Sequence, residues 1–343
     1  MADVTNDPRD GSGGCRSRSD WRADEPAPAS DEDRAQLILI TGLALAVILV
    51  AVVLLLNTAI YSENLATRGV DAGGAEAVDF RDGTVDDVAA IMHREHRNES
   101  TDAAPDDFEA SAAVYANAIA DLRARDGVIA DVRAVTNVTG HFVAQDELDD
   151  GSHRNMTDAA GTESWVLASN VTRTRNYHLT VDSASLDGPD SFVVVTERPN
   201  ATWTMSLSNG ADDAIDVTVN NGTHTVSETF EHAPGENVTI DVTGGTVNGD
   251  PFPALVWAEH VQNGTVEYDL RYENGDAVAG TYHFVVDQMD TPSNEQYGNP
   301  PSDRSSQPYV VDAVYSADVA VSHRTPELEY ADVIRVAPGE RDA

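Results

Sequence analysis

The sequence predicts an α+β protein with a single N-terminal transmembrane helix, a short helical stem and an antiparallel β-sandwich as its exterior domain. Three observations predict this: an uninterrupted apolar segment near the N-terminus, two later segments with apolar residues at helical spacing, and alternating apolar residues over much of the second half. We divide the chain into a disordered leader (1–33), the transmembrane helix (34–62), a linker (63–83), a helical hairpin or stem (84–126), the β-sandwich (127–336) with a flexible loop at 288–308, and a polar tail (337–343).

The apolar segment, residues 37–56, reads LILITGLALAVILVAVVLLL, and no charged residue lies between Arg34 and Glu63. Twenty residues of α-helix span about 30 Å, which matches the hydrocarbon core of a bilayer. A helix of this length in a soluble protein shows a polar face, and this one has none. The segment is therefore predicted to cross a membrane.

The arginines around this segment give its orientation. Five of them precede it and only Arg68 follows closely: Arg9, Arg16, Arg18, Arg22 and Arg34. Because basic residues remain on the cytoplasmic side, the leader is expected in the cytoplasm and the C-terminal domain outside the cell. A cleaved secretory signal is not predicted, since the apolar run is too long and no A-x-A site follows it.

The composition is strongly acidic. The 343 residues carry a formal net charge of −38, and the chain contains no lysine. Such repulsion ordinarily favours disorder, but molar salt shortens the Debye length to about 3 Å and screens it. The composition resembles that of proteins from haloarchaea. Without a basic patch, binding to nucleic acid is not expected.

Asp33-Arg34-Ala35-Gln36 stands immediately before the apolar segment. A basic residue, a small residue, glutamine and then an apolar helix resemble the processing site of archaeal type IV pilin-like proteins and archaellins. The resemblance implies that a prepilin-type peptidase cuts after Ala35, that Gln36 becomes the new N-terminus, and that the helix then enters a filament core. The long leader departs from the family pattern, and an uncleaved anchor is the alternative.

Two helices are predicted after the membrane segment. Gly69, Gly73 and Gly74 are expected to end the first helix. A second helix is predicted from Thr84, a suitable N-cap, to Arg97. Residues 106–125 then carry apolar side chains three and four positions apart, and these two helices form the predicted stem.

Period-two alternation predicts the sandwich. The strongest local signal is Asn274-Gly275 between two alternating segments, which predicts a β-hairpin. Many short strands separated by Gly and Asn turns are typical of a sandwich. Expected strands lie near 165–168, 177–181, 192–195, 203–207, 215–219, 238–242, 255–261, 266–272, 278–286, 310–321 and 333–336.

The motif N-x-[ST] occurs eight times, always on the predicted exterior side: at Asn98, Asn137, Asn155, Asn170, Asn200, Asn221, Asn237 and Asn263. The motif marks acceptors for N-linked glycans, so we expect a glycosylated surface.

No catalytic or cofactor motif is recognised. The HREH segment, His93 to His96, fails the spacing of zinc proteases, and the acidic turn from Asp146 to Gly151 lacks the EF-hand pattern. A polar helix face and a solvated turn are the expected roles. Trp165, Trp203 and Trp257 are expected in the core. We expect no metal, no cofactor and no enzymatic activity.

Two functions fit these features. The first is a minor pilin-like subunit or component of a type IV pilus-like surface assembly, whose partners are the membrane and similar subunits. The second is an adhesion or binding module on an uncleaved single-pass anchor; an anchored enzyme is a distant third.

The acidic composition gives a prediction about salt. Residues 84–343 should lose structure when salt falls from molar to about 0.1 M, where the Debye length grows to about 10 Å and the carboxylates repel one another. Circular dichroism across this range measures the loss. Spectra that stay the same at both salt concentrations would contradict it.

Overall fold

The computed structural model describes residues 31–97, 104–186, 190–211, 213–233, 235–290, 296–298 and 308–340; at 31–34 and 59–73 it describes the backbone alone. Two compact units are formed by Met1–Thr67 and Arg68–Ala343. The predicted α+β class, with an apolar N-terminal helix and antiparallel sheets, is confirmed. The leader up to residue 30, including its predicted disorder, lies outside the described residues.

Helix α1 runs from Asp31 to His96 without interruption. The helix therefore does not break at Gly69, Gly73 and Gly74, and the prediction of a linker over 63–83 is wrong, since the backbone there is helical. An isolated glycine costs a helix only about 1 kcal/mol relative to alanine, and alanines at 66, 72, 75 and 77 are the best helix formers. The second predicted helix of the stem is α2, Ala104–Arg125, close to its expected bounds.

The rest of the second unit is built of two antiparallel sheets. The larger has the order β11-β10-β9-β4-β13-β1-β14-β15, with β2 paired to β13, and the smaller has the order β3-β12-β5-β6-β7-β8. The strands are β1 (Ile129–Gln145), β2 (Arg154–Asn155), β3 (Trp165–Val171), β4 (Thr174–Asp182), β5 (Phe192–Arg198), β6 (Ala201–Asn209), β7 (Ala214–Asn220), β8 (Thr225–Glu231), β9 (Asn237–Asp241), β10 (Thr246–Val247), β11 (Asp250–Pro251), β12 (Tyr268–Glu273), β13 (Ala279–Val286), β14 (Tyr309–Arg324) and β15 (Glu329–Val336).

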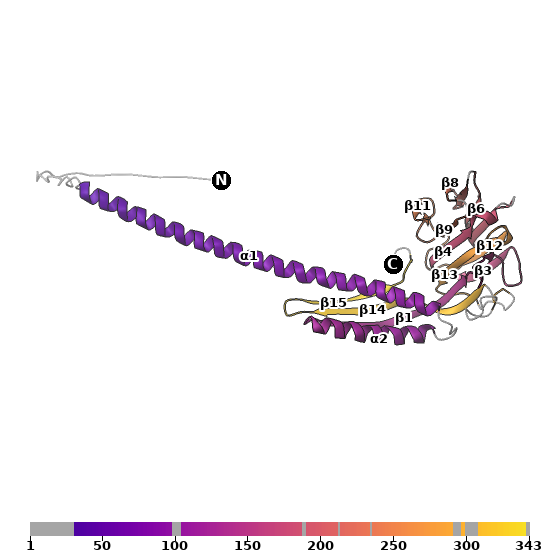
Figure 1. Cartoon of the computed structure of the whole chain (residues 1–343), viewed down its shortest axis with the longest axis horizontal. Coiled ribbons are helices and arrows are strands. Elements are labelled where there is room, and N and C mark those ends of the chain that lie inside the picture. The colour runs from indigo at the N-terminus through magenta and orange to yellow at the C-terminus, as the bar shows by residue number, and fades with distance from the viewer. Residues whose placement is uncertain are drawn as a thin grey trace, which may run out of the picture. The chain divides into compact units, whose positions relative to one another are not determined.

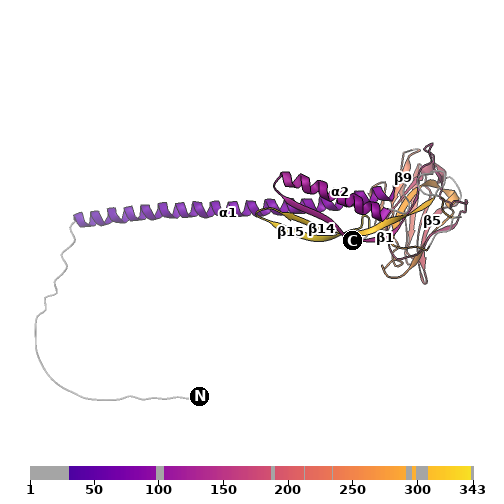
Figure 2. The same ribbon diagram turned by 90° about the horizontal axis from the view of Figure 1, so that it is seen from below.

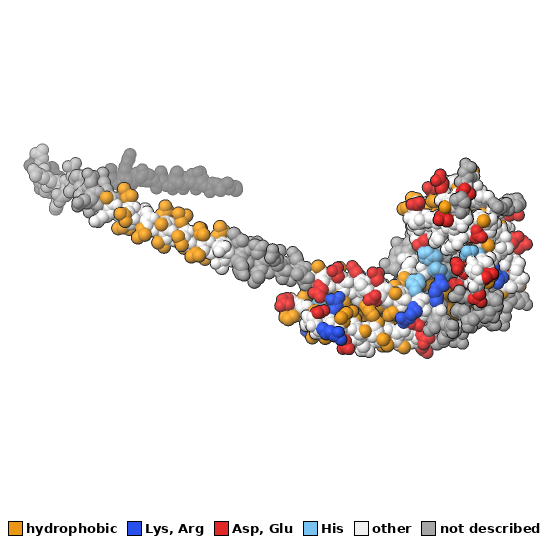
Figure 3. Space-filling model, in the orientation of Figure 1, with side chains coloured by type: hydrophobic (Ala, Val, Ile, Leu, Met, Phe, Trp, Pro, Cys, Tyr) orange, Lys and Arg blue, Asp and Glu red, His pale blue; other side chains and the backbone are white. Residues whose placement is uncertain are grey.

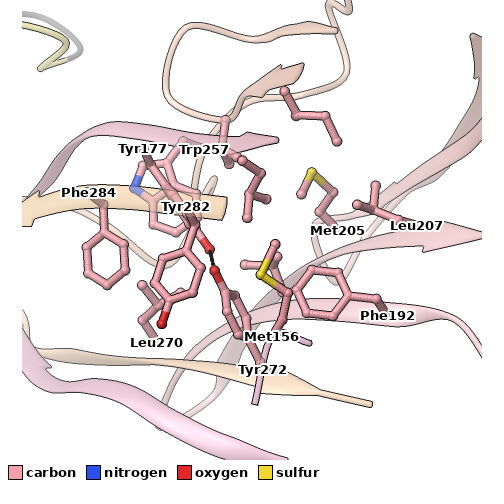
Figure 4. Close-up of a cluster of buried hydrophobic side chains, with 14 of the residues drawn as sticks. Met156, Tyr177, Phe192, Met205, Leu207, Trp257, Leu270, Tyr272, Tyr282 and Phe284 are labelled. Atoms are coloured by element: carbon pink, nitrogen blue, oxygen red, sulfur yellow. Dashed lines mark hydrogen bonds between the residues drawn. The ribbon is translucent and has the colours of Figure 1, made fainter. Parts of the chain in front are cut away.

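The sandwich core lies between the two sheets and is rich in aromatic side chains. Trp203 and Tyr272 from the smaller sheet and Tyr177 and Phe284 from the larger sheet are all fully buried. In Figure 4 the hydroxyls of Tyr177 and Tyr272 point toward each other, and Tyr177 donates a hydrogen bond of 2.9 Å. This bond satisfies two polar groups that are costly to bury alone. As predicted, Trp165, Trp203 and Trp257 are core residues.

A second core forms where the two helices cover one face of β1, β14 and β15 (Figures 1 and 2). Met92 of α1 and Phe108 of α2 are completely buried there. Residues 77–96 of α1 thus form a stem layer together with α2 and these three strands. Because β1 and β14 are long, one part of each lies in the stem layer and the other part in the sandwich.

The predicted hairpin at Asn274-Gly275 is wrong. β12 belongs to the smaller sheet and β13 to the larger, and a short 3₁₀ helix, Gly275–Ala277, carries the chain between them. The Gly275 N–H donates to the carbonyl of Glu163 at 2.7 Å, and its carbonyl accepts from Met156 N at 2.8 Å. The backbone of this turn is therefore bonded to the segment before β3. Alternating apolar residues occur in two strands of facing sheets as well as in the two strands of one hairpin, so this pattern does not distinguish the two arrangements.

Two other segments differ from expectation. Residues 255–261 form turns rather than a strand, but they close over the core, and Val261 is fully buried. In the predicted loop at 288–308, the described part includes Tyr297, which is buried and donates its hydroxyl to the carbonyl of Leu167. Residues 291–295 and 299–307 of this loop lie outside the described residues.

Arg175 on β4 fixes the chain's C-terminal segment to the fold. Its guanidinium is fully buried and donates to the carbonyls of Tyr315 at 2.6 Å, Val314 at 2.8 Å and Pro338 at 2.9 Å. Burial lowers its pKa to about 10, so it stays charged at neutral pH. The predicted polar tail is thus partly packed: Glu340 is half-buried and pairs with Arg335.

Arg175 should be among the most sensitive positions in the domain. Arg175→Met is expected to lower the free energy of unfolding by about 3 kcal/mol or more, because three buried carbonyls lose a charged donor. Arg324→Met is the control, since Arg324 forms an exposed pair with Glu329 and should cost under about 1 kcal/mol. Chemical denaturation in molar salt measures both. Equal losses in the two variants would refute the role given to Arg175.

Candidate functional site

The first candidate site is the apolar part of α1. Residues Ala35–Thr58 are long and apolar enough to cross a membrane. None of this segment is buried within the chain; Leu37 is 63% and Leu55 is 71% exposed. Hydrophobic side chains cover the visible face of this segment in Figure 3. Water is a poor solvent for such a surface, so it needs lipid or another apolar helix around it.

The two threonine hydroxyls in this segment are satisfied inside the helix. The hydroxyl of Thr41 donates to the carbonyl of Leu37 at 2.6 Å, and that of Thr58 donates to Leu54 at 2.8 Å. Such bonds remove the cost of placing a hydroxyl in hydrocarbon. Ala35 and Gln36 are exposed and lie in the helix, directly before the apolar segment. The predicted processing position is therefore at the surface.

The second candidate site is a cluster of histidines where α1 meets the larger sheet; histidine side chains gather there in Figure 3. His96 is buried against Phe142, with ring centroids 5.6 Å apart, and its Nε2 accepts from Val314 N at 3.2 Å. His178 and His283, from neighbouring strands, stack at 5.0 Å. Arg97 lies near this pair: its Nη2 is 3.4 Å from Nδ1 of His283.

These surroundings favour neutral imidazoles. Burial lowers the pKa of His96 to about 3, and the positive charge of Arg175 adds to the effect. Burial, together with the charge of Arg97, also lowers the pKa of His283 to about 3. Burial also lowers the pKa of His93. His93, His96 and His283 are therefore packed, uncharged side chains at neutral pH.

The geometry gives this cluster no metal-binding arrangement. Within the described residues, no group of three or more His, Cys, Asp or Glu is placed to hold a metal ion. His93 and His96 of the HREH segment instead contact Asn176 and Phe142. In the acidic turn, Asp146 accepts from Arg97 at 3.0 Å and from the hydroxyl of Tyr309 at 2.8 Å, so its carboxylate has a structural role.

The glycosylation motifs are the third set of candidate sites. Asn98 lies outside the described residues. Of the other seven, Asn137 and Asn221 are half-buried, and the remaining five are exposed: Asn155, Asn170, Asn200, Asn237 and Asn263. All seven lie in the second unit, on strands or in the turns between them.

Sequence reasoning missed most of the histidine cluster. His178 and His283 are 105 positions apart and become neighbours only because β4 pairs with β13, in a register that places them opposite each other. Arg175 was also missed, because arginine at a strand position is ordinarily expected to face solvent. A period-two count from Tyr177 through Leu179 and Val181 places Arg175 on the buried face, and this was the available signal.

A family model described as "Family of unknown function (DUF7261)" matches residues 31–197, just under half of the chain. The similarity includes α1, α2 and the strands up to most of β5. No curated protein and no solved structure matches the chain.

The histidine cluster predicts acid sensitivity. Unfolded His96 binds a proton near pH 6.5 and folded His96 only near pH 3, so falling pH favours unfolding across this window, by about 5 kcal/mol at most. His96→Gln keeps an acceptor for Val314 N but does not titrate. We expect a shallower fall in unfolding free energy between pH 6.5 and 4 in this variant.

The control is His224→Gln in an exposed turn, measured by denaturation at the same pH values and salt. The carboxylates titrate equally in all three proteins, so only the difference between their slopes matters. An identical pH slope for wild type and His96→Gln would contradict the assignment.

Proposed function

We propose that this chain is a surface protein of an extreme halophile, held in the membrane by α1 with its C-terminal domain outside, and that it serves as a minor pilin-like subunit of a type IV pilus-like assembly. The observation that carries the proposal is an apolar helix with no covering side chains directly after Arg34-Ala35-Gln36. Such a surface can be covered by lipid or by helices of the same kind.

Removal of the leader changes what this helix can do. Arg34 is the last charged residue before the apolar segment, and the next charge is Glu63. With Arg34 present, the helix end is held at the cytoplasmic face, because a charged side chain is costly within hydrocarbon. A cut after Ala35 leaves a helix without charged side chains over 27 residues, 36–62, which is free to leave the bilayer by packing on other helices.

The helix also carries a feature suited to such packing. Gly42 and Ala46 are four positions apart, so they lie on the same side of the helix. Small residues at this spacing let two helix backbones approach closely in apolar surroundings. The packing energy then comes from van der Waals contact, since lipid and helix side chains are equally apolar.

The other end of α1 supports the same proposal. Phe80, Val88 and Met92 of α1 are buried against the stem strands, so the helix that enters the membrane is also part of the folded domain. An anchor built in this way needs no separate linker to carry the domain. The excess of arginine before the helix supports the orientation with the domain outside.

Processing is the direct test. If the proposal is correct, the mature protein begins at Gln36, and either Arg34→Ala or Ala35→Leu blocks maturation and leaves the leader attached. Arg22→Ala is the matched control, because it removes a leader arginine away from the site and should mature normally. N-terminal peptides identified by mass spectrometry of the membrane and surface fractions give the result. Leader peptides in the mature wild-type protein would instead support a permanently anchored binding module.

A further inference from the structure

Four of the glycosylation motifs converge at one end of the smaller sheet. Asn200 lies in the turn between β5 and β6, Asn221 follows β7, Asn170 is near the end of β3, and Asn263 precedes β12. Because neighbouring strands of this sheet are all antiparallel, these four positions lie at the same end of the strands. We call this row of strand ends the edge. Six strands at a spacing of about 4.8 Å give this edge a width of about 24 Å.

The transfer reaction sets two requirements at each motif. A C–N bond forms between Nδ2 of asparagine and the anomeric carbon of a lipid-phosphate-linked oligosaccharide. The bond from that carbon to the phosphate oxygen breaks, the phosphate leaves with the electron pair, and the amide loses one proton. The Nδ2 group and the hydroxyl two residues later, which defines the motif, must both be within reach of the transferase.

Carboxylates hold three of the acceptor amides. Nδ2 of Asn137 donates to Glu109 at 2.9 Å, that of Asn170 to Asp290 at 2.7 Å, and that of Asn221 to Glu259 at 2.7 Å. Each bond must break before the amide can react, and bonds to charged acceptors are stronger than neutral ones.

Two further motifs are restricted in other ways. At Asn155 the hydroxyl belongs to Thr157, which is only 6% exposed. At Asn237 the acceptor residue itself lies in β9, where it pairs with Asp182 of β4. An asparagine within a strand ladder cannot enter an enzyme's active site without breaking that ladder.

Asn200 and Asn263 are different. Both are exposed, as are Thr202 and Thr265, and both asparagines lie outside the strands. The Oδ1 atom of Asn263 accepts from Thr265 N at 3.1 Å and from Val266 N at 2.9 Å, but among the described residues no carboxylate holds the Nδ2 group of either asparagine. Asn263 and Thr265 lie in a loop outside the strands, and the hydroxyl of Thr265 donates to Oδ1 of Asn263 at 3.1 Å. The two loops are neighbours, since Arg198 donates to the carbonyl of His260 at 2.8 Å.

We propose that N-linked oligosaccharide is attached to the folded domain at Asn200 and Asn263, and that the contacts above make the other five described motifs poor acceptors. The pair forms a glycan-bearing edge on the smaller sheet. The proposal rests on the exterior location of the domain in the proposed function.

Site occupancy in the full chain, purified from a haloarchaeal host, tests the proposal. Peptides are quantified with and without glycan by mass spectrometry. We expect high occupancy at Asn200 and Asn263, loss of each glycan in Asn200→Gln and Asn263→Gln, and at most low occupancy at the five restricted motifs. Similar occupancy at all seven described motifs would overturn the proposal, because modification would then precede folding.

A matched pair of variants tests the role of the carboxylate directly. Glu109 is exposed on α2, so Glu109→Ala should fold and release the amide of Asn137, whereas Glu109→Gln keeps an acceptor oxygen for it. Occupancy at Asn137 is expected to rise at least about twofold in the alanine variant only, because water competes for this exposed hydrogen bond and limits what its loss can change. No difference between the two variants would overturn this part.

The same spectra separate this proposal from the proposed function. A mature N-terminus at Gln36 with no glycan at either asparagine refutes the glycan edge and leaves the subunit proposal intact. Glycans at Asn200 and Asn263 on a protein that retains its leader refute processing and support the glycan edge.

Discussion

The pairing of β1 with β14 is the interaction on which both cores of the second unit depend. The ladder extends from Ile129 opposite Arg324 to Ala144 opposite Tyr309. At one end of the ladder, β1 and β14 pack against α1 and α2 in the stem layer. At the other end, the same two strands pack with β13 in the part of the larger sheet that faces the smaller one. Gly140 lies where β1 passes between these regions, and a Cβ there would collide with the carbonyl of Val286. The two cores are thus joined by continuous strands, without a flexible connection.

This shared ladder explains why polar groups are buried beside it. Where α1 ends, His96 accepts from the backbone of Val314, and Arg175 bonds the carbonyl of the same residue from β4. A neutral imidazole and a buried guanidinium therefore bind the backbone of the same β14 residue. Each satisfies backbone groups that an irregular strand leaves free, since the register of β14 against β1 shifts between Val138 and Thr139.

Local patterns in the sequence predicted the class, the membrane helix, α2 and most strands, because each depends on the spacing of neighbouring residues. The errors concern partners and continuity. Asn274-Gly275 has the composition of a hairpin turn, but its backbone is bonded to residues near 156 and 163, which no local pattern reveals. The glycines near residue 70 lower helix propensity without ending the helix. Likewise, the sequence marks every glycosylation motif equally, whereas the carboxylates that hold three of the amides are distant in the chain.

The order of the elements along the chain has a consequence for how the domain is completed during synthesis. β1 is made about 180 residues before its partner β14, and Arg175 bonds the carbonyl of Pro338, which is 163 residues further along the chain. Until the ribosome has made β14 and β15, the apolar faces of α1 and α2 lack most of the sheet that covers them. Contacts this distant in sequence form slowly, and the apolar surface that stays exposed until they form promotes aggregation. Truncated chains that end before residue 309 therefore lack β14 and β15, two of the three strands of the stem layer. Their helices keep an exposed apolar face, which chaperones and proteases recognise.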